Sequence, residues 1–255
     1  MDLQLTGLVA VVTGSSTGIG RASAVALAAE GVQVVGVSRR APEFEVDGVS
    51  HFGADLSDPD APRQAIEHAV ERHGRLDILV NNAGAGRVFE GFLGEDADEW
   101  SATLNLNLVA AVRAMQAAIP HLLVRGGAIV NVTSVNSRLP AEDSAAYSAS
   151  KAALLNVGKA VATQYAALGV RVVTISPGLT ATPMWLGRDG IASQIGAMSG
   201  ADPVDVAANA AAGTPLGRFI TPEEVADCIC FVSSPRASAV TGAELVVDGG
   251  LTPTI

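Results

Sequence analysis

The sequence predicts an α/β protein in which a doubly wound parallel sheet of about seven strands carries helices on both faces. Short apolar runs alternate with segments of helical period along all 255 residues, which is typical of parallel strands joined by helical crossovers. Right-handed crossovers place helices on both faces of such a sheet. The apolar residues are mostly Ala, Val, Leu and Ile, and aromatic residues make up only 4% of the chain. That composition suits buried parallel strands under close-packed helices.

Each expected strand is a short apolar run between helical or turn segments. The expected strands are residues 8–12, 32–37, 49–52, 76–80, 128–132, 170–175 and 243–247. The segments between them have helical period at residues 18–30, 58–73, 96–124, 146–168 and 221–233. This order of elements predicts one domain over residues 1–255.

Several helix ends carry sequence signals. Asp58-Pro59 and Thr221-Pro222-Glu223-Glu224 resemble helix caps with proline at the first helical position. Gly31 and Gly169 follow the ends of expected helices, where a left-handed residue is favoured. Residues 184–213 interrupt the alternation with little β-type sequence. A long irregular insert in a compact domain is usually a lid or a binding loop, so we expect a substrate lid here; a helical decoration without a role is the alternative.

The charge balance narrows the possible partners. The chain has 16 Lys and Arg against 26 Asp and Glu, a formal charge of −10, and no basic cluster. Nucleic acid and membrane surfaces both favour a concentrated basic patch, so neither is an expected partner. The apolar run at 8–12 is too short to span a membrane and lacks the basic start of a signal peptide. Cys228 and Cys230 lie two apart on an expected helix, so we expect no disulfide, no metal site and a cytoplasmic location.

Tyr147 and Lys151 are the first candidate catalytic pair. Residues four apart share one face of a helix. A lysine ammonium beside a phenol favours the phenolate and lowers the tyrosine's pKa from about 10. Such a tyrosine exchanges a proton with a substrate oxygen near neutral pH, as reversible carbonyl reduction requires.

A glycine-rich turn between the first strand and the first helix is typical of a nucleotide site. It reads Gly14-Ser-Ser16-Thr17-Gly18-Ile19-Gly20. Glycines there let the backbone approach a pyrophosphate, while the N–H groups of the helix receive the anion. The spacing Gly-x-x-x-Gly-x-Gly differs from the commonest dinucleotide fingerprint.

The end of the second strand predicts which cofactor is bound. An acidic residue there binds the 2′-hydroxyl of NAD, whereas arginine accommodates the 2′-phosphate of NADP. This chain has Ser38-Arg39-Arg40 and no carboxylate. Guanidinium groups pair strongly with a phosphate dianion. We therefore expect NADP(H), with Arg39 the better candidate, and keep NAD(H) as the alternative.

Taken together, these motifs resemble the compact single-domain branch of the short-chain dehydrogenase/reductase family, with a Rossmann-type fold. The resemblance covers essentially the whole chain. It rests on Thr13-Gly14-x-x-x-Gly18-Ile19-Gly20, Asp55-Leu56, Asn81-Asn82-Ala83-Gly84, Trp100 with Asn107, Ser134, Tyr147-x-x-x-Lys151, Pro177-Gly178, Thr182, Leu216-Gly217-Arg218, Pro222-Glu223-Glu224-Val225-Ala226 and Val247-Asp248-Gly249-Gly250.

The resemblance implies a role for each of four catalytic positions. Tyr147 would be the general acid in reduction and the base in oxidation, and Ser134 would hydrogen-bond the substrate oxygen. Lys151 would lower the tyrosine pKa and bind the nicotinamide ribose. Asn107, favoured over Asn105, would hold a water that links Lys151 to solvent.

The resemblance also implies cofactor contacts from several segments. Asp55 and Leu56 would border the adenine, and Asn82, Ala83 and Gly84 would line the cleft. Tyr147 and Lys151 would serve this site too, beside Pro177 and Gly178. The Leu179 backbone and the Thr182 side chain would meet the carboxamide or phosphates. The implied activity is hydride transfer between nicotinamide and a ketone, aldehyde or secondary alcohol.

Substrate identity is the least determined expectation. The candidate pocket residues lie between Ser134 and Tyr147 or at the start of the insert: Asn136, Arg138, Glu142, Asp143, Trp185 and Leu186. A 3-oxoacyl reductase acting on acyl carrier protein is one alternative, although the chain offers only Arg113, His121 and Arg125 as a basic docking surface. A non-catalytic NADPH-binding regulator is another. The resemblance implies a homo-oligomer, a tetramer or a dimer, paired through the two long helices and the C-terminal strand.

Overall fold

The computed structural model describes residues 1–42 and 45–253 and contains one parallel sheet of seven strands. Each expected apolar run forms a strand of this sheet. The strands are β1 (Val9–Thr13), β2 (Gln33–Ser38), β3 (Val49–Gly53), β4 (Ile78–Asn81), β5 (Gly127–Val132), β6 (Val170–Pro177) and β7 (Glu244–Val247). Their order is β3-β2-β1-β4-β5-β6-β7. The chain therefore changes direction across the sheet between β1 and β4, and ligands of doubly wound sheets bind at such a point.

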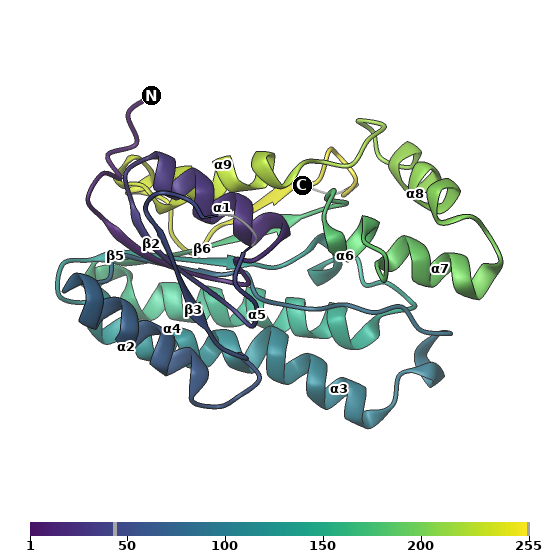
Figure 1. The fold of residues 1–255 in the computed structure, drawn as a ribbon, viewed down its shortest axis with the longest axis horizontal. Coiled ribbons are helices and arrows are strands. Elements are labelled where there is room, and N and C mark those ends of the chain that lie inside the picture. The colour runs from purple at the N-terminus through teal and green to yellow at the C-terminus, as the bar shows by residue number, and fades with distance from the viewer. Residues whose placement is uncertain (43–44, 254–255) are drawn as a thin grey trace.

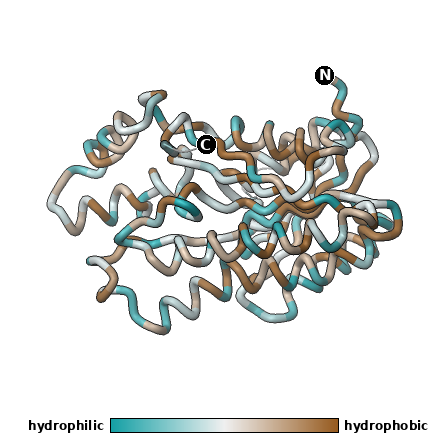
Figure 2. The backbone as a smooth tube through the Cα atoms, turned by 180° about the vertical axis from the view of Figure 1, so that it is seen from behind, coloured by the Kyte–Doolittle hydropathy of each residue, from teal (hydrophilic) through white to brown (hydrophobic). Residues whose placement is uncertain are grey.

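Helices cover both faces of the sheet (Figure 1). On one face lie α1 (Gly18–Ala29) and α9 (Pro222–Ser233), and on the other α2 (Ala61–His73), α4 (Ala110–Leu122) and α5 (Ala145–Tyr165). Each face has its own apolar core, with side chains such as Leu27 and Ile229 on one side and Leu79 and Leu122 on the other. The hydrophobic segments gather along the central strands in Figure 2. Within the described part of the chain, no helix has the length and apolar character that spanning a bilayer requires.

Two helix starts test the capping signals. The capping box at α9 is confirmed, because the Thr221 side chain accepts from Glu224 N while the Glu224 carboxylate accepts from Thr221 N. The start expected at Asp58-Pro59 is wrong. The Asp58 carboxylate accepts from Asp60 N in a preceding turn, and α2 begins at Ala61. Gly31 and Gly169 adopt φ values of +83° and +85°, as expected.

The long helix expected at 96–124 is interrupted. It forms α3 (Ala97–Leu104), a π-helical segment η2 (Asn105–Val109) and then α4. A π-bulge inserts one extra residue into a helix and is frequent at functional sites. In this chain the widened turn carries Asn107, which is buried.

The segment 184–213 is helical rather than irregular. It contains α6 (Pro183–Leu186), α7 (Ile191–Ser199) and α8 (Pro203–Ala212), which extend together from one end of the sheet (Figure 1). Pro203 begins α8, and the Asp202 side chain caps it by accepting from Val204 N. Of the glycines in the segment, Gly196 lies within α7 and the others end its helices or separate them, so they do not make it irregular. The described residues also form the short 3-10 turns η1 (Phe92–Gly94), η3 (Val135–Ser137), η4 (Ala166–Leu168) and η5 (Pro235–Ala237).

A row of polar residues crosses the sheet beneath α5. Asn81, Asn131, Thr174 and Glu244 are paired in register across β4, β5, β6 and β7. Asn81 Nδ2 donates to Asn131 Oδ1 at 2.9 Å. Gly158 of α5 lies directly over the row, where a Cβ atom would come within 2.9 Å of Asn131 Nδ2. The sheet therefore changes from apolar to polar toward its carboxyl edge on the α5 side.

Candidate active site

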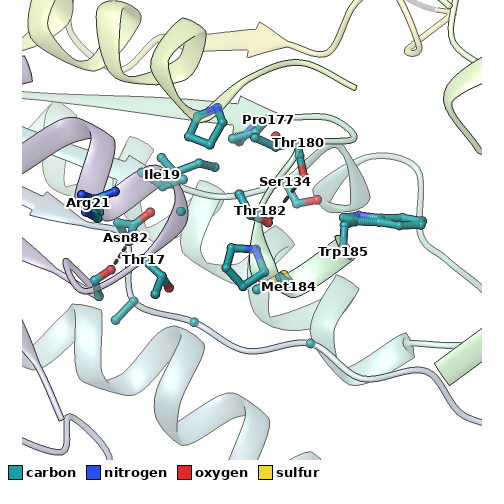
Figure 3. A pocket seen from close by; sticks show the side chains of 18 of the residues that line it. Thr17, Ile19, Arg21, Asn82, Ser134, Pro177, Thr180, Thr182, Met184 and Trp185 are labelled. Carbon is teal, nitrogen blue, oxygen red and sulfur yellow. Dashed lines mark hydrogen bonds between the residues drawn. The ribbon is translucent and has the colours of Figure 1, made fainter. Parts of the chain in front are cut away.

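A cleft of about 1530 Å³ opens at the carboxyl edge of the sheet. One wall is the turn after β1, with Ile19 and Arg21 of α1, and the segment after β5 with Ser134 lies farther along. In Figure 3 Arg21 and Asn82 lie at one end of the labelled residues and Trp185 at the other, with Thr182 and Met184 between them. The cleft brings together segments from both halves of the chain.

The glycine-rich turn has the shape that a close ligand requires. Gly14 and Gly18 have positive φ values of +68° and +56°. A Cβ atom on Gly20 would lie 2.3 Å from both Gly14 O and Asn82 Nδ2, so only glycine lets α1 pack this closely. Gly20 does not line the cleft itself. Gly20 therefore does not contact the cleft as a cofactor-binding residue would; it lets α1 pack closely against Gly14 and Asn82.

Asn82 and Thr13 tie the turn to the next strand. Asn82 Nδ2 donates to Thr13 O at 2.9 Å and to Gly14 O at 3.3 Å. The Thr13 hydroxyl accepts from the backbone N–H groups of Asn82 and Ala83, at 2.9 and 3.0 Å. The two sequence motifs that contain these residues therefore form a single structural unit, which holds the cleft wall before any ligand arrives.

The residues present fit a dinucleotide. Thr17 precedes α1, but its side chain makes no capping hydrogen bond, and the first turn of α1 has no acidic residue. The N-terminal N–H groups of α1 are thus left without a side-chain acceptor, which is the arrangement that receives a pyrophosphate. Ser16, Ile19, Ala83 and Gly84 line the same wall, and Thr182 packs on Gly18, where a Cβ atom would meet Thr182 Cγ2 at 3.1 Å.

The other end of the nucleotide region is cationic. Arg39 and Arg40 are exposed and line the cleft after β2. Ser38 Oγ donates to Arg40 O at 2.7 Å, which shapes the turn that presents both arginines. Asp55 and Leu56 also line the cleft. Hydrogen bonds from Ser57 lower the pKa of Asp55, and the nearby Arg39 lowers it further.

Tyr147 and Lys151 lie together in the cleft near Ser134. Lys151 is 3% exposed, its Nζ donates to Val132 O at 3.0 Å, and it lies 5.6 Å from the centre of the Tyr147 ring. Burial lowers the pKa of Lys151 to about 8. Burial also raises the pKa of Tyr147, against a smaller lowering by a hydrogen bond with Ser134. The pKa of Tyr147 is therefore raised and not lowered as its spacing from Lys151 predicts, because burial disfavours the phenolate.

Asn107 uses its side chain to hold the segment after β4. Its Oδ1 accepts from Ala85 N and its Nδ2 donates to Ala85 O, both at 2.9 Å. Nδ2 also lies 3.2 Å from Ser150 Oγ, which donates to Tyr147 O. A Cβ on Gly84 would lie 3.2 Å from both Asn107 Oδ1 and Lys151 Nζ, so the two residues meet there. Asn105 instead donates to Ser57 O.

The substrate candidates divide into two groups. Asn136, Asp143 and Trp185 line the cleft, with Pro177, Gly178, Leu179 and Thr182 nearby. Arg138, Glu142 and Leu186 do not line it, so assigning them to the pocket is wrong. Arg138 Nε binds the Glu244 carboxylate at 2.5 Å on the far side of its segment, while Glu142 and Leu186 are exposed. Neighbouring side chains of a turn point in different directions, and sequence spacing alone does not specify which of them face a cleft.

The structure reveals contacts around the tyrosine that sequence reasoning does not predict. Gly86 packs on its ring, where a Cβ atom would approach Cδ2 to 3.1 Å. Gln194 of α7 accepts from Val88 N at 2.9 Å and so joins the helical insert to the segment carrying Gly86. The buried carboxylate of Glu95 accepts from Ala146 N at the start of α5. No local signal marks the partners of Gln194 or Glu95, because those partners lie far away in sequence.

Comparison with known proteins agrees with this geometry. A family model described as enoyl-(acyl carrier protein) reductase matches residues 14–252. Cis-4-hydroxycyclohexanecarboxylate dehydrogenase of Sinomonas cyclohexanicum is 36% identical over 253 residues, which cover 96% of each chain. The chain belongs to the short-chain dehydrogenase/reductase family. It is an oxidoreductase with a Rossmann-type fold, and this family binds a nicotinamide cofactor.

Other members of the short-chain dehydrogenase/reductase family resemble the chain over its full length. Mouse L-xylulose reductase is 35% identical and covers 100% of both chains. The 3-oxoacyl-[acyl-carrier-protein] reductase of Thermotoga maritima is 33% identical over 98% of this chain and 99% of its own. The structure of Gluconobacter frateurii L-sorbose reductase complexed with NADPH and L-sorbose superposes with a TM-score of 0.89 at 33% identity, covering 100% of both chains.

Proposed function

We propose that this protein is an NADP(H)-dependent oxidoreductase that interconverts a small ketone or aldehyde with the corresponding alcohol, with Tyr147 as the general acid and base. One observation carries the proposal: Tyr147, Lys151 and Ser134 lie together in one cleft. The other end of that cleft has the features of a dinucleotide site. A bound nicotinamide cofactor supplies or accepts the hydride.

The protein's own residues manage the proton and the developing charge. Ser134 hydrogen-bonds the substrate oxygen and stabilises its charge in the transition state. A phenol with a raised pKa keeps its proton at neutral pH, so Tyr147 is ready to donate from Oη in the direction of reduction. Lys151, with a pKa of about 8, lies close enough to stabilise the phenolate left behind. Asn107 holds the segment above Lys151 and belongs to the path that returns the proton from solvent.

NADP(H) is the proposed cofactor because Arg39 and Arg40 both border the part of the cleft, after β2, where the adenosine ribose would lie. The L-sorbose reductase structure, with NADPH bound, supports this choice by similarity. The helical insert is proposed as the substrate lid, since Trp185 of α6 lines the cleft and packs edge-on against Phe219 at 5.5 Å. We further propose a homo-oligomer of this single-domain chain, paired through α4, α5 and β7.

Small hydroxylated or cyclic compounds are the proposed substrate class. The relatives named above act on L-xylulose, L-sorbose and cis-4-hydroxycyclohexanecarboxylate. The pocket beside Tyr147 mixes polar Asn136 with apolar Met184 and Trp185. A panel of these three compounds, with cyclohexanone as a neutral ketone, measures the activity through the absorbance of NADPH.

Substitution of Tyr147 tests the mechanism. Tyr147→Phe removes the only group proposed to exchange the proton, so turnover falls by at least about 100-fold. Binding of NADPH, followed by its fluorescence, stays within about twofold of wild type because the ring remains. Tyr165→Phe is the matched control, since it removes the hydroxyl of the chain's other tyrosine. Substantial turnover by Tyr147→Phe eliminates the acid and base role.

A second candidate function is reduction of an acyl chain on acyl carrier protein. The matching family model and the Thermotoga maritima relative favour it. Against it stands the formal charge of −10, because an acidic carrier protein docks on a basic surface. Comparing 3-oxobutyryl groups carried by acyl carrier protein and by a short thioester decides the matter. A large preference for the carrier-bound form supports the second candidate.

A further inference from the structure

We propose that Glu244 is a positioning residue for Ser134, acting from the edge strand β7 by holding the chain on both sides of that serine. The proposal rests on the proposed function, in which Ser134 binds the substrate oxygen. Neither Glu244 nor its partner Arg138 lines the cleft, so neither contacts the substrate. Their effect on the reaction passes through the serine.

The hold on the N-terminal side of Ser134 runs through two buried hydroxyl groups. Ser176 Oγ donates to Glu244 Oε1 at 2.6 Å. Ser176 Oγ and Thr133 Oγ1 lie 2.7 Å apart, and Thr133 N also donates to Ile175 O. Thr133 immediately precedes Ser134 and lines the cleft. The chain entering Ser134 is thus anchored to the carboxylate through β6.

The hold on the C-terminal side is an ion pair. Arg138 Nε donates to Glu244 Oε2 at 2.5 Å. Between Ser134 and Arg138 lies only the single turn η3, which Arg138 closes by donating its backbone N–H to Val135 O. One carboxylate therefore holds both ends of the six-residue segment 133–138, with Oε2 binding Arg138 directly and Oε1 reaching Thr133 through Ser176.

The chemistry of these contacts explains why a carboxylate is needed. The Glu244 side chain is only 8% exposed, and a buried charge is tolerated when both oxygens are hydrogen-bonded. Charge-assisted hydrogen bonds are also shorter and stiffer than neutral ones. Stiffness matters here because a displacement of about 1 Å at a reacting group costs about 100-fold in rate.

A double-mutant cycle with Ser134→Ala separates positioning from general stability. Glu244→Gln keeps an acceptor for Ser176 but presents an amide to Arg138. We expect it to lower kcat/KM about tenfold, mainly through kcat, on the fastest substrate of the panel above. In the Ser134→Ala background the same change lowers kcat/KM less than twofold, because the group that Glu244 positions is already gone.

Arg138→Met is the second variant, since the Arg138 side chain is 58% exposed and its loss leaves the Ser176 contact intact. We expect a smaller loss that also disappears in the Ser134→Ala background. Glu67→Gln is the matched control, because it breaks an exposed carboxylate–arginine pair with Arg63 on α2. NADPH binding and the unfolding temperature check that each variant is folded.

The outcomes are distinct. Losses that vanish without the Ser134 hydroxyl support the proposal. Equal losses in both backgrounds, or wild-type rates in Glu244→Gln, overturn it while leaving the proposed function in place. An inactive wild-type protein across the panel, with NADPH bound, overturns the proposed function, and the positioning role falls with it.

Discussion

Lys151 carries a charge into the protein interior, where its Nζ donates to the Val132 carbonyl oxygen. Its folded-state pKa of about 8 lies below the ordinary value of 10.5. Between these two pH values the unfolded chain binds more protons than the folded chain, so folding stability due to this group rises with pH. Below pH 8 both states are protonated and the contribution is constant.

We therefore predict a pH-dependent difference between wild type and Lys151→Met. The free energy of unfolding of wild type, relative to the variant, should rise by on the order of 1–3 kcal/mol between pH 8 and pH 10.5. Urea unfolding at several pH values measures it. If the free energies of unfolding of wild type and Lys151→Met change in parallel with pH over this range, burial does not destabilise the Lys151 ammonium.

Arg39 provides a test of the proposed preference for NADP(H). Arg39→Asp replaces a cation with an anion where the 2′-phosphate is proposed to bind. The KM for NADPH should rise by roughly 10- to 100-fold, and the KM for NADH should change little. Steady-state kinetics with both cofactors measures the two effects. Arg40→Asp is the companion variant and should have the smaller effect; equal changes in both KM values exclude the assignment.

Helix α9 depends on an arginine from a different element. Arg171 of β6 donates to the carbonyl groups of Val232, Val240, Ser233 and Ser234, at 2.8 to 3.3 Å. These include the last carbonyl groups of α9, to which no N–H group of the helix itself donates. The guanidinium thus closes the end of α9 and joins it to β6. Burial lowers its pKa, yet arginine stays charged at any ordinary pH.

We predict that Arg171→Met destabilises the protein by about 2–3 kcal/mol, because buried carbonyl groups lose charge-assisted partners. Thermal and urea unfolding measure the change. Arg236→Met is the control, since Arg236 is exposed and its Nε donates to Asp2 O at the chain's N-terminus. Similar stabilities for the two variants would count against a capping role for Arg171.

At the level of elements, local signals predicted where most strands and helices lie. The capping box at Thr221 and the glycines at 31 and 169 act through adjacent backbone, so sequence is enough to find them. The π-helical turn at Asn107 was missed because its cause is tertiary. The buried Asn107 side chain bonds to the backbone of Ala85 in the segment after β4, which favours a widened turn over a regular helix. In the insert the glycines predict an irregular segment, whereas capping residues such as Asp202, which accepts from Val204 N, predict the helices that the structure has.

At the level of the whole molecule, the sheet topology gathers the site. Parallel strands place all their carboxyl ends on one edge, so the turn after β1, the segments after β4 and β5 and the turn after β6 meet there. This explains why motifs spread from residue 14 to residue 182 line one cleft. It also explains why Glu244, at the far edge of the sheet, reaches the segment around Ser134.

The sequence by itself determined the fold class, the family and the residue types available for chemistry, because periodicity, glycine spacing and motif order are local properties of the chain. Only the tertiary structure decided which side chains face the cleft. It turned Arg138 from a substrate candidate into the partner of Glu244, and it raised the Tyr147 pKa that the spacing alone predicted to fall. Burial and long-range partners set both outcomes, and they exist only once distant segments have packed together.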